Sequence, residues 1–322
     1  MLLEDQHPDN KSIMVAVLGA PNVGKSSLVN YLLGMDLSIV TNKPQTTRNR
    51  FHAVLTIDRT EIVLVDTPGL HKSSQELNKR INQQAREGVD GADLNLLLID
   101  LTKDVLQQFV DFKENIDKEL GRTWVVFTKS DRVEAASELP LSMVMEKAKL
   151  IMPNLEKHFL TSSKSGYNVH LLTGDICDEA IPGPHFYDRG AISNKPERFF
   201  ATEYIREQAF ALLKDELPYE LAVVIDEYKD IKPKPGEDGA SHISASILVN
   251  RPSQRAIVVG SKGSIIKEIG TRARKKISAM TDNKVHLNLH VKVSPKWFKN
   301  NFILEELGLP RAQDSARVWR NK

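Results

Sequence analysis

The chain has 322 residues, a formal net charge of +2, and a composition that is 41% hydrophobic and 27% charged, as expected for a soluble protein of about two domains. Its longest apolar runs are far shorter than the roughly 20 residues of a membrane-spanning helix, which argues against a transmembrane protein. Its single cysteine, Cys177, excludes an internal disulfide, and no N-terminal signal is visible, so we expect a cytoplasmic protein.

A glycine-rich loop is the first strong signal. It lies between an apolar run at 13–18, predicted to be a buried strand, and a predicted helix at 27–33, and residues 1–11 are predicted to be a disordered tail. Residues 19–26, the phosphate loop, fit G-x-x-x-x-G-K-[ST], in which backbone N–H groups, a lysine and a hydroxyl hold phosphates and Mg²⁺. The candidate phosphate-binding residues are Gly19, Ala20, Pro21, Asn22, Val23, Gly24, Lys25, Ser26 and Ser27.

Strands and helices alternate through the rest of the first domain, which we place at residues 12–180. Strands are predicted at 51–57, 61–65, 94–101, 123–127 and 158–161, and helices at 75–89, 105–120, 141–151 and 168–178. This alternation predicts an α/β fold, with a mainly parallel sheet covered by helices on both faces. Ligands of such sheets bind beyond the carboxyl ends of the strands, where the motifs described next are found.

Two of these motifs complete a predicted triphosphate and Mg²⁺ site. Asp66 ends an apolar strand and can hold Mg²⁺ through water, and Gly69 leaves its N–H open to a γ-phosphate. Thr47, in a polar loop, can add a second hydroxyl to the metal. The alternatives are an ordinary turn residue for Asp66 and an ordinary loop residue for Thr47. The candidate Mg²⁺ ligands are Ser26, Thr47 and Asp66, and the candidate catalytic residues are Asn22, Lys25, Thr47 and Gly69.

The base-binding motif follows the strand at 123–127. The carboxylate of Asp131 can accept hydrogen bonds from N1–H and the exocyclic amine of guanine, and adenine offers no such pair of donors. The sequence therefore predicts GTP and GDP as ligands. The stem of Lys129 can lie over the base, and the backbone N–H of Ser163 can bond the guanine O6. The candidate base-binding residues are Thr128, Lys129, Asp131, Ser162, Ser163 and Lys164.

These motifs, in this order, resemble the translation-factor-like branch of GTPases, with three departures. Ser163 replaces the usual alanine, which should matter little because its backbone makes the contact. Thr128 stands where asparagine is usual and lacks the amide that ties the base motif to the phosphate loop, so we expect guanine selectivity and leave the affinity open. Leu70 stands where Ras-type enzymes carry a water-orienting glutamine, so unaided hydrolysis should be slow. The resemblance implies that a bound K⁺, held partly by Asn22, compensates. A plain turn role for Asn22 is the alternative.

A second, smaller α+β domain is predicted at 199–310, after a Pro- and Gly-rich linker at 181–198 and before a tail at 311–322. Helices are predicted at 199–213 and 264–279, and strands at 221–228, 243–250 and 285–293. Residues 256–259 are apolar and fit a strand or a helix equally well.

The second domain holds the most basic part of the chain. Residues 251–299 contain 12 basic side chains against only Glu268 and Asp282. A G-x-x-G turn at 260–263 precedes the basic helix, as in a KH domain that clamps single-stranded RNA. A plain surface turn is the alternative. The candidate RNA-binding residues are Arg255, Gly260, Ser261, Lys262, Gly263, Lys267, Arg272, Arg274, Lys275 and Lys276.

Taken together, the GTPase motifs, the linker, residues 216–219 and the basic G-x-x-G segment resemble the Era family of bacterial GTPases over nearly the whole chain. Further matches lie at 19–28, 44–48, 66–71, 198–199 and 265–270. The resemblance implies GTP hydrolysis, binding of the 3′ end of small-subunit ribosomal RNA, a role in assembling that ribosomal subunit, and peripheral contact with the inner face of the cell membrane. We expect a monomer. The alternatives are an RNA-modification GTPase and a passive RNA-binding module.

Overall fold

The structure is a computed structural model, and it describes residues 6–41, 43, 46–70, 76–136, 140–231 and 239–309. The predicted tail at 311–322 lies outside these residues, as do residues 44–45 and 71 of the family matches. The chain divides into two compact units. The first comprises Met1–Ser38, Thr47–Ser74 and Ile81–Asn194, and the second comprises Ile39–Thr46, Gln75–Arg80 and Lys195–Lys322.

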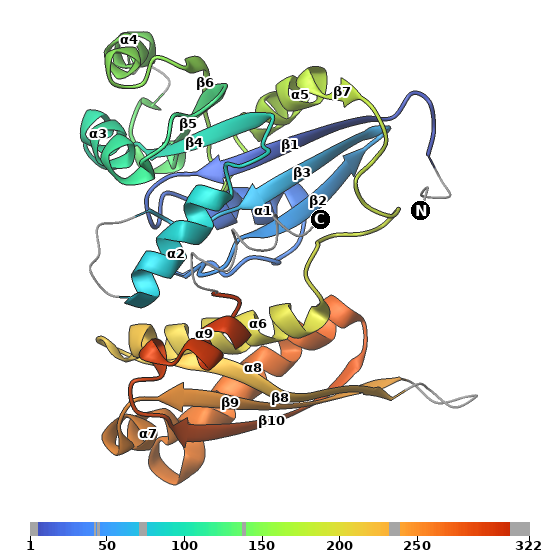
Figure 1. The fold of residues 1–322 in the computed structure, drawn as a ribbon, viewed down its shortest axis with the longest axis vertical. Coiled ribbons are helices and arrows are strands. Elements are labelled where there is room, and N and C mark those ends of the chain that lie inside the picture. The colour runs from blue at the N-terminus through green and yellow to red at the C-terminus, as the bar shows by residue number, and fades with distance from the viewer. Residues whose placement is uncertain are drawn as a thin grey trace. The chain divides into compact units, whose positions relative to one another are not determined.

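A sheet with the strand order β2-β3-β1-β4-β5-β6 forms the centre of the first unit (Figure 1). Neighbouring strands are parallel, except that β2 and β3 are antiparallel. This arrangement confirms the predicted α/β fold. The strands are β1 (Lys11–Leu18), β2 (Phe51–Ile57), β3 (Thr60–Asp66), β4 (Leu94–Asp100), β5 (Thr123–Thr128) and β6 (Leu155–Leu160).

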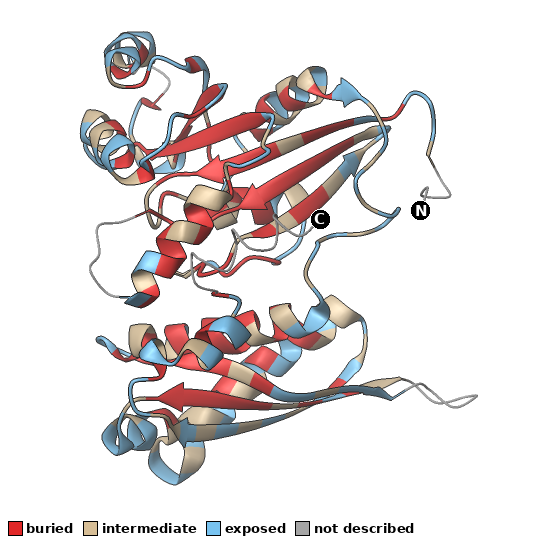
Figure 2. Ribbon diagram, in the orientation of Figure 1, coloured by how far each residue is buried: buried red, intermediate tan, exposed pale blue. Residues whose placement is uncertain are grey.

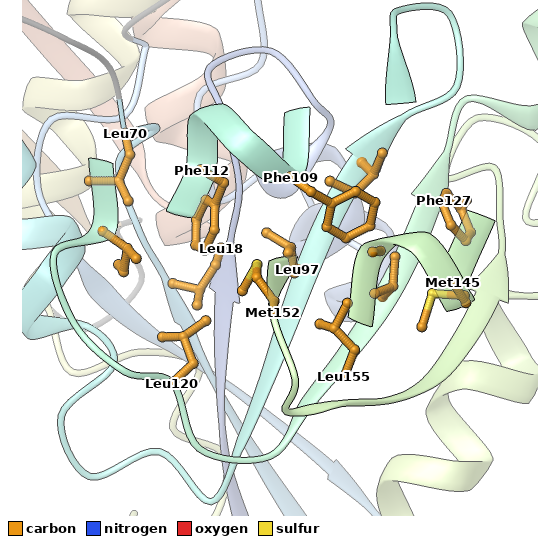
Figure 3. Close-up of a cluster of buried hydrophobic side chains, with 14 of the residues drawn as sticks. Leu18, Leu70, Leu97, Phe109, Phe112, Leu120, Phe127, Met145, Met152 and Leu155 are labelled. Atoms are coloured by element: carbon orange, nitrogen blue, oxygen red, sulfur yellow. The ribbon is translucent and has the colours of Figure 1, made fainter. Parts of the chain in front are cut away.

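Helices cover both faces of this sheet. On one face, side chains of α3 and α4 pack with strand residues in a buried cluster that includes Leu97, Phe109, Phe127 and Met145 (Figure 3). On the other face α1 and α5 contact the sheet. Figure 2 shows the central strands buried over most of their length, because apolar side chains on both faces are covered. The helices are α1 (Lys25–Leu33), α2 (Glu76–Glu87), α3 (Val105–Ile116), α4 (Leu141–Ile151) and α5 (Val169–Glu179).

The ends of several elements differ from the sequence predictions. Helix α3 ends at Ile116 instead of continuing to residue 120, because Asp117 adopts the left-handed conformation (φ 54°) that terminates a helix. Strand β1 begins at Lys11, and the side chain of Asn10 donates to that of Gln6 (3.2 Å). The described residues 6–11 are therefore ordered where the sequence predicted a disordered tail, and residues 1–5 lie outside the description.

Much of the segment predicted as a linker packs on the first unit. Strand β7 (Ile181–Pro182) pairs antiparallel with β1, and the N–H of Val54 on β2 donates to the carbonyl of Ile192 (3.0 Å). The buried carboxylate of Glu61 accepts the backbone N–H of Phe186 (2.7 Å). This compact unit therefore reaches Asn194, beyond the predicted domain end at residue 180.

The second unit is a three-stranded sheet in the order β10-β9-β8, with α6 and α8 over one face (Figure 1). Strands β9 and β10 are parallel, and β8 is antiparallel to β9. The predicted α+β organisation is confirmed. The elements are α6 (Glu197–Leu212), β8 (Ala222–Ile231), β9 (Ala240–Val249), α7 (Pro252–Val259), α8 (Ser264–Thr281), β10 (Lys284–Val293) and α9 (Asn301–Glu306).

Residues 256–259, which the sequence left undecided, belong to helix α7. Pro252 supplies the fixed φ that suits the first turn, and the side chain of Gln254 accepts the N–H groups of Asn250 (2.8 Å) and Arg251 (3.1 Å). The G-x-x-G turn therefore joins two helices. Helix α9 was not predicted. In the part of the chain that the structure describes, no helix is long and apolar enough to cross a membrane.

Candidate functional site

The phosphate loop occupies the turn between β1 and α1. Gly19, Asn22 and Gly24 all have positive φ (138°, 63° and 108°), and a Cβ on Gly19 would lie 2.7 Å from the carbonyl oxygen of Leu98. Only glycine fits there without moving a strand of the central sheet. The predicted residues 19–27 all lie in this turn or in the first turn of α1, whose backbone N–H groups can bind an anion.

Lys25 is the buried cation of this loop. Its side chain is only 6% exposed, and its Nζ donates to the carbonyls of Gly19 (3.1 Å) and Ala20 (3.0 Å). Burial lowers the pKa of Lys25 to about 8, and the Asp66 carboxylate partly opposes this shift. The ammonium is thus held inside the loop by weak carbonyl acceptors that phosphate oxygens can replace.

The three predicted Mg²⁺ ligands lie together. The Ser26 hydroxyl is 3.0 Å from the Thr47 hydroxyl and donates to Oδ2 of Asp66 (3.2 Å). The same carboxylate oxygen accepts from the hydroxyl of Ser38 (2.9 Å). Hydroxyl and carboxylate oxygens are the hard ligands that Mg²⁺ prefers, so these residues fit that ion.

Sequence reasoning missed Ser38. Its backbone is fixed by the side chain of Asn30 on α1, which donates to the Ser38 carbonyl (2.9 Å) and accepts its N–H (2.7 Å). No motif or hydrophobic period marks this serine in its irregular segment, so no sequence signal could have found it.

The segment after β3 lies against the phosphate loop. The Thr67 hydroxyl donates to the Val17 carbonyl on β1 (2.6 Å), and a Cβ on Gly69 would lie 2.6 Å from the backbone nitrogen of Pro21. Gly69 is therefore required for this close approach. The next side chain, Leu70, packs into the buried cluster of Figure 3. The position at which Ras-type enzymes place glutamine thus supplies only an apolar side chain, and that side chain is buried in the core.

The base loop, residues 128–131, is tied to the phosphate loop twice. The Thr128 hydroxyl lies 2.6 Å from the Val23 carbonyl, and Nζ of Lys129 donates to the Asn22 carbonyl (2.7 Å). Thr128 lacks the amide of the usual asparagine, and its hydroxyl makes the contact with the phosphate loop from the end of β5.

Asp100, at the end of β4, supports Lys129 and was also missed. The carboxylate is fully buried and lies 2.6 Å from Nζ of Lys129, and it accepts the hydroxyl of Thr102 (2.7 Å). Burial raises the pKa of Asp100, but the hydrogen bonds from Lys129 and Thr102 outweigh it and hold the pKa below its ordinary value. Its position at a strand end is the signal that could have identified it.

Asp131 lies next to the third base-binding segment. Its Oδ1 accepts the hydroxyl of Ser162 (2.6 Å), and the Ser162 N–H donates to the carbonyl of Tyr167 (3.1 Å). Ser163 is half-buried and Lys164 exposed. The structure thus brings the predicted base residues together at the ends of β5 and β6, beside the phosphate loop.

The G-x-x-G turn of the second unit presents an exposed cation between two helices. Gly260, Lys262 and Gly263 all have positive φ (74°, 50° and 78°). A Cβ on Gly260 would lie 2.7 Å from the Ile265 side chain, whereas one on Gly263 would meet nothing within 4 Å. Ser261 and Lys262 are exposed, so phosphates can approach this turn.

A groove of about 520 Å³ lies between β10 and α8, the helix that follows this turn. Lys267 and Arg274 of α8 line one wall, and His286 and His290 of β10 line the other. The remaining predicted cations are more scattered. Arg255 and Lys275 are exposed, Arg272 pairs with Glu268 (2.7 Å), and Lys276 pairs with Glu207 of α6 (2.8 Å).

Two known families match parts of the chain. Residues 14–129 match the family described as "50S ribosome-binding GTPase", and residues 216–298 match the KH domain family. The fold and the site define a GTPase of the phosphate-loop class that carries a KH domain.

The chain is 37% identical to the GTPase Era of Thermotoga maritima over 300 residues, covering 93% of this chain and 97% of the relative. It is also 37% identical to that of Pseudomonas fluorescens, covering 91% and 95%. The chain belongs to the Era family, as its sequence predicted.

Solved Era structures share the fold. One is Era in complex with MgGDPNP and nucleotides 1506–1542 of 16S ribosomal RNA, with a TM-score of 0.82, 30% identity and coverage of 94% of this chain and 100% of that one. Another is a single-residue variant of Aquifex aeolicus Era bound to GDP and AlF4⁻, with a TM-score of 0.84, 31% identity and the same coverage.

Proposed function

We propose that the chain is a GTP-hydrolysing switch that binds small-subunit ribosomal RNA and acts in the assembly of that subunit. One observation carries the nucleotide part: Lys25, the Ser26–Thr47–Asp66 cluster and Asp131 lie around the carboxyl ends of β1, β3 and β5, and the Thr128 and Lys129 contacts join the base loop to the phosphate loop. The Era complexes with MgGDPNP, GDP–AlF4⁻ and 16S ribosomal RNA support the same ligands here.

Each residue has a defined task in this proposal. Lys25 and backbone N–H groups of the phosphate loop hold the β- and γ-phosphates, and Asp131 with the backbone of Ser163 reads guanine. Ser26, Thr47 and Asp66 would hold Mg²⁺, which neutralises phosphate charge when bound. Gly69 directs its N–H toward the γ-phosphate. Loss of that phosphate would release the segments that carry Thr47 and Gly69, which makes the chain a switch.

Hydrolysis is expected to be faster in K⁺ than in Na⁺ because Leu70 cannot orient water and because the family resemblance implies that Asn22 helps to hold a K⁺ ion. We expect about a tenfold difference in kcat, equivalent to about 1.4 kcal/mol of barrier. The measurement is phosphate release in KCl and in NaCl at equal ionic strength.

Asn22→Gly is the matched variant, since glycine keeps the positive φ of this position and removes the amide. It should hydrolyse GTP equally slowly in both salts. Equal rates for the unaltered protein in the two salts would rule out the K⁺ role and leave Asn22 with only the role of a turn residue.

The RNA part of the proposal is tested at Gly263, where there is room for a side chain. Gly263→Asp should weaken binding of a single-stranded oligonucleotide from the 3′ end of 16S ribosomal RNA by at least about tenfold, because it sets a carboxylate against RNA phosphates. Gly263→Asn has nearly the same shape without the charge and should bind within about threefold of the unaltered protein. Fluorescence anisotropy measures both.

The same oligonucleotide separates the candidate functions. A switch should change its rate of GTP hydrolysis when the oligonucleotide is added, and the Gly263→Asp variant should respond less. A modification GTPase predicts no response to this RNA, and a passive RNA-binding module predicts no GTP turnover at all.

The remaining assignments are proposals of the same kind. We propose that the nucleotide domain begins at residue 12 and includes the packed segment up to Asn194, and that the RNA domain spans 199–310, in a cytoplasmic, monomeric protein. The exposed cations of α8 support peripheral contact with the anionic inner face of the cell membrane.

A further inference from the structure

Strand β10 divides its side chains between the two faces of the small sheet. Leu289 points toward α8, since a Cβ on Gly270 would lie 3.4 Å from it, and Val285 is buried. Successive side chains of a strand alternate, so the even-numbered residues lie on the face away from α8, here called the open face. Those residues are all exposed: Lys284, His286, Asn288, His290 and Lys292.

Two histidines are stacked on the open face. His242 of β9 lies directly opposite His286 of β10 in the parallel register. Their ring centroids are 4.6 Å apart with 32° between the planes, and both residues are exposed. The pair therefore offers the edges and outer faces of two imidazole rings to solvent, built on two strands whose backbone fixes its position.

This aromatic pair continues the groove of the G-x-x-G unit. His286 and His290 line the groove together with Lys267 and Arg274, although their side chains start from the open face. Because β10 is the edge strand of the described sheet, a ligand in the groove can pass over this edge onto the open face without leaving the protein surface.

The chemistry of the open face favours RNA over a metal ion or an apolar partner. No group of three or more metal-ligating side chains occurs in the described residues. Asp226 accepts hydrogen bonds from Ser246 (2.6 Å) and Lys292 (2.9 Å), so its charge is compensated. The surface is polar, and single-stranded RNA bases stack readily on exposed imidazole rings.

We propose that His242, His286 and His290 extend the RNA-binding surface from the groove onto the open face, with the His242–His286 pair stacking a nucleobase and His290 contacting the adjoining backbone. This inference rests on the proposed RNA-binding function. It adds at least one nucleotide to the stretch that the G-x-x-G turn and the groove hold.

The test is anisotropy with the full chain and single-stranded oligonucleotides of increasing length. His286→Ala should weaken binding of the longer oligonucleotides about five- to tenfold and weaken binding of the shortest ones less. His286→Phe keeps a stacking ring and should restore near-normal affinity at neutral pH. His170→Ala, an exposed histidine of α5, is the matched control and should have no effect.

If the unaltered protein binds RNA and the His286→Ala variant binds oligonucleotides of every length with the same affinity, this inference alone is overturned. Failure of the unaltered protein to bind any oligonucleotide would overturn the proposed RNA function and this inference with it.

Discussion

Lys25→Ala should lose at least about a hundredfold in affinity for GTP and GDP. The ammonium can make hydrogen bonds to two phosphates, and each such bond to a charged group is worth about 1.5–3 kcal/mol. Isothermal titration or the fluorescence of a labelled nucleotide measures the loss. Binding of the ribosomal oligonucleotide by the nucleotide-free variant should remain, because Lys25 belongs to the first unit and the G-x-x-G turn to the second.

The pH profile provides the control for this variant. Burial lowers the pKa of free Lys25 to about 8, and phosphates favour its charged form. GDP affinity should therefore be constant below about pH 8 and fall above it, because binding must then take up a proton. Lys25→Ala should lack this fall. Micromolar GTP affinity in the variant would contradict the phosphate-loop assignment.

Asp131→Asn should change the base preference of the nucleotide site from guanine to xanthine. The carboxylate offers two acceptors to guanine N1–H and the 2-amine, whereas asparagine offers one acceptor and one donor. The donor opposes the guanine amine but matches the 2-oxo group of xanthine, so GTP affinity should fall about a hundredfold or more and XTP affinity should rise. Competition between the two triphosphates for a labelled nucleotide measures the exchange.

The matched control is Asp111→Asn, which makes the same chemical change on the exposed surface of α3 and should leave both affinities unchanged. Ser162 donates to Asp131 in the unaltered protein and can also donate to the asparagine oxygen, so the side chain should keep its orientation. If Asp131→Asn retained its preference for GTP, the base would have to be read elsewhere.

The sequence was sufficient to predict most of the architecture. The apolar runs and the motifs at their ends identified the strands of the large sheet, because a strand buried on both faces is apolar throughout and its last residue meets the ligand. Lys25, Asp66 and Asp131 were found in this way. The polar alternation of β10 likewise predicted a half-buried strand.

What could not be predicted depended on contacts between distant parts of the chain. The apolar pattern of residues 256–259 is compatible with either a strand or a helix. The hydrogen bonds that the side chain of Gln254 accepts at the N-terminus of α7 stabilise the helix. Ser38 reaches Asp66 only because Asn30 bends the chain after α1. The segment at 181–194 reads as a linker from its prolines and glycines, yet its backbone pairs with β1 and β2.

The parallel pairing of β10 with β9 has a consequence for synthesis of the protein. Helices α7 and α8 come between these two strands, so the sheet is completed only after both helices have left the ribosome. Until then β9 has one unpaired edge, and such late, non-local pairing is slow. A nascent chain halted before Lys284 should therefore be protease-sensitive in this unit while its nucleotide half is already resistant.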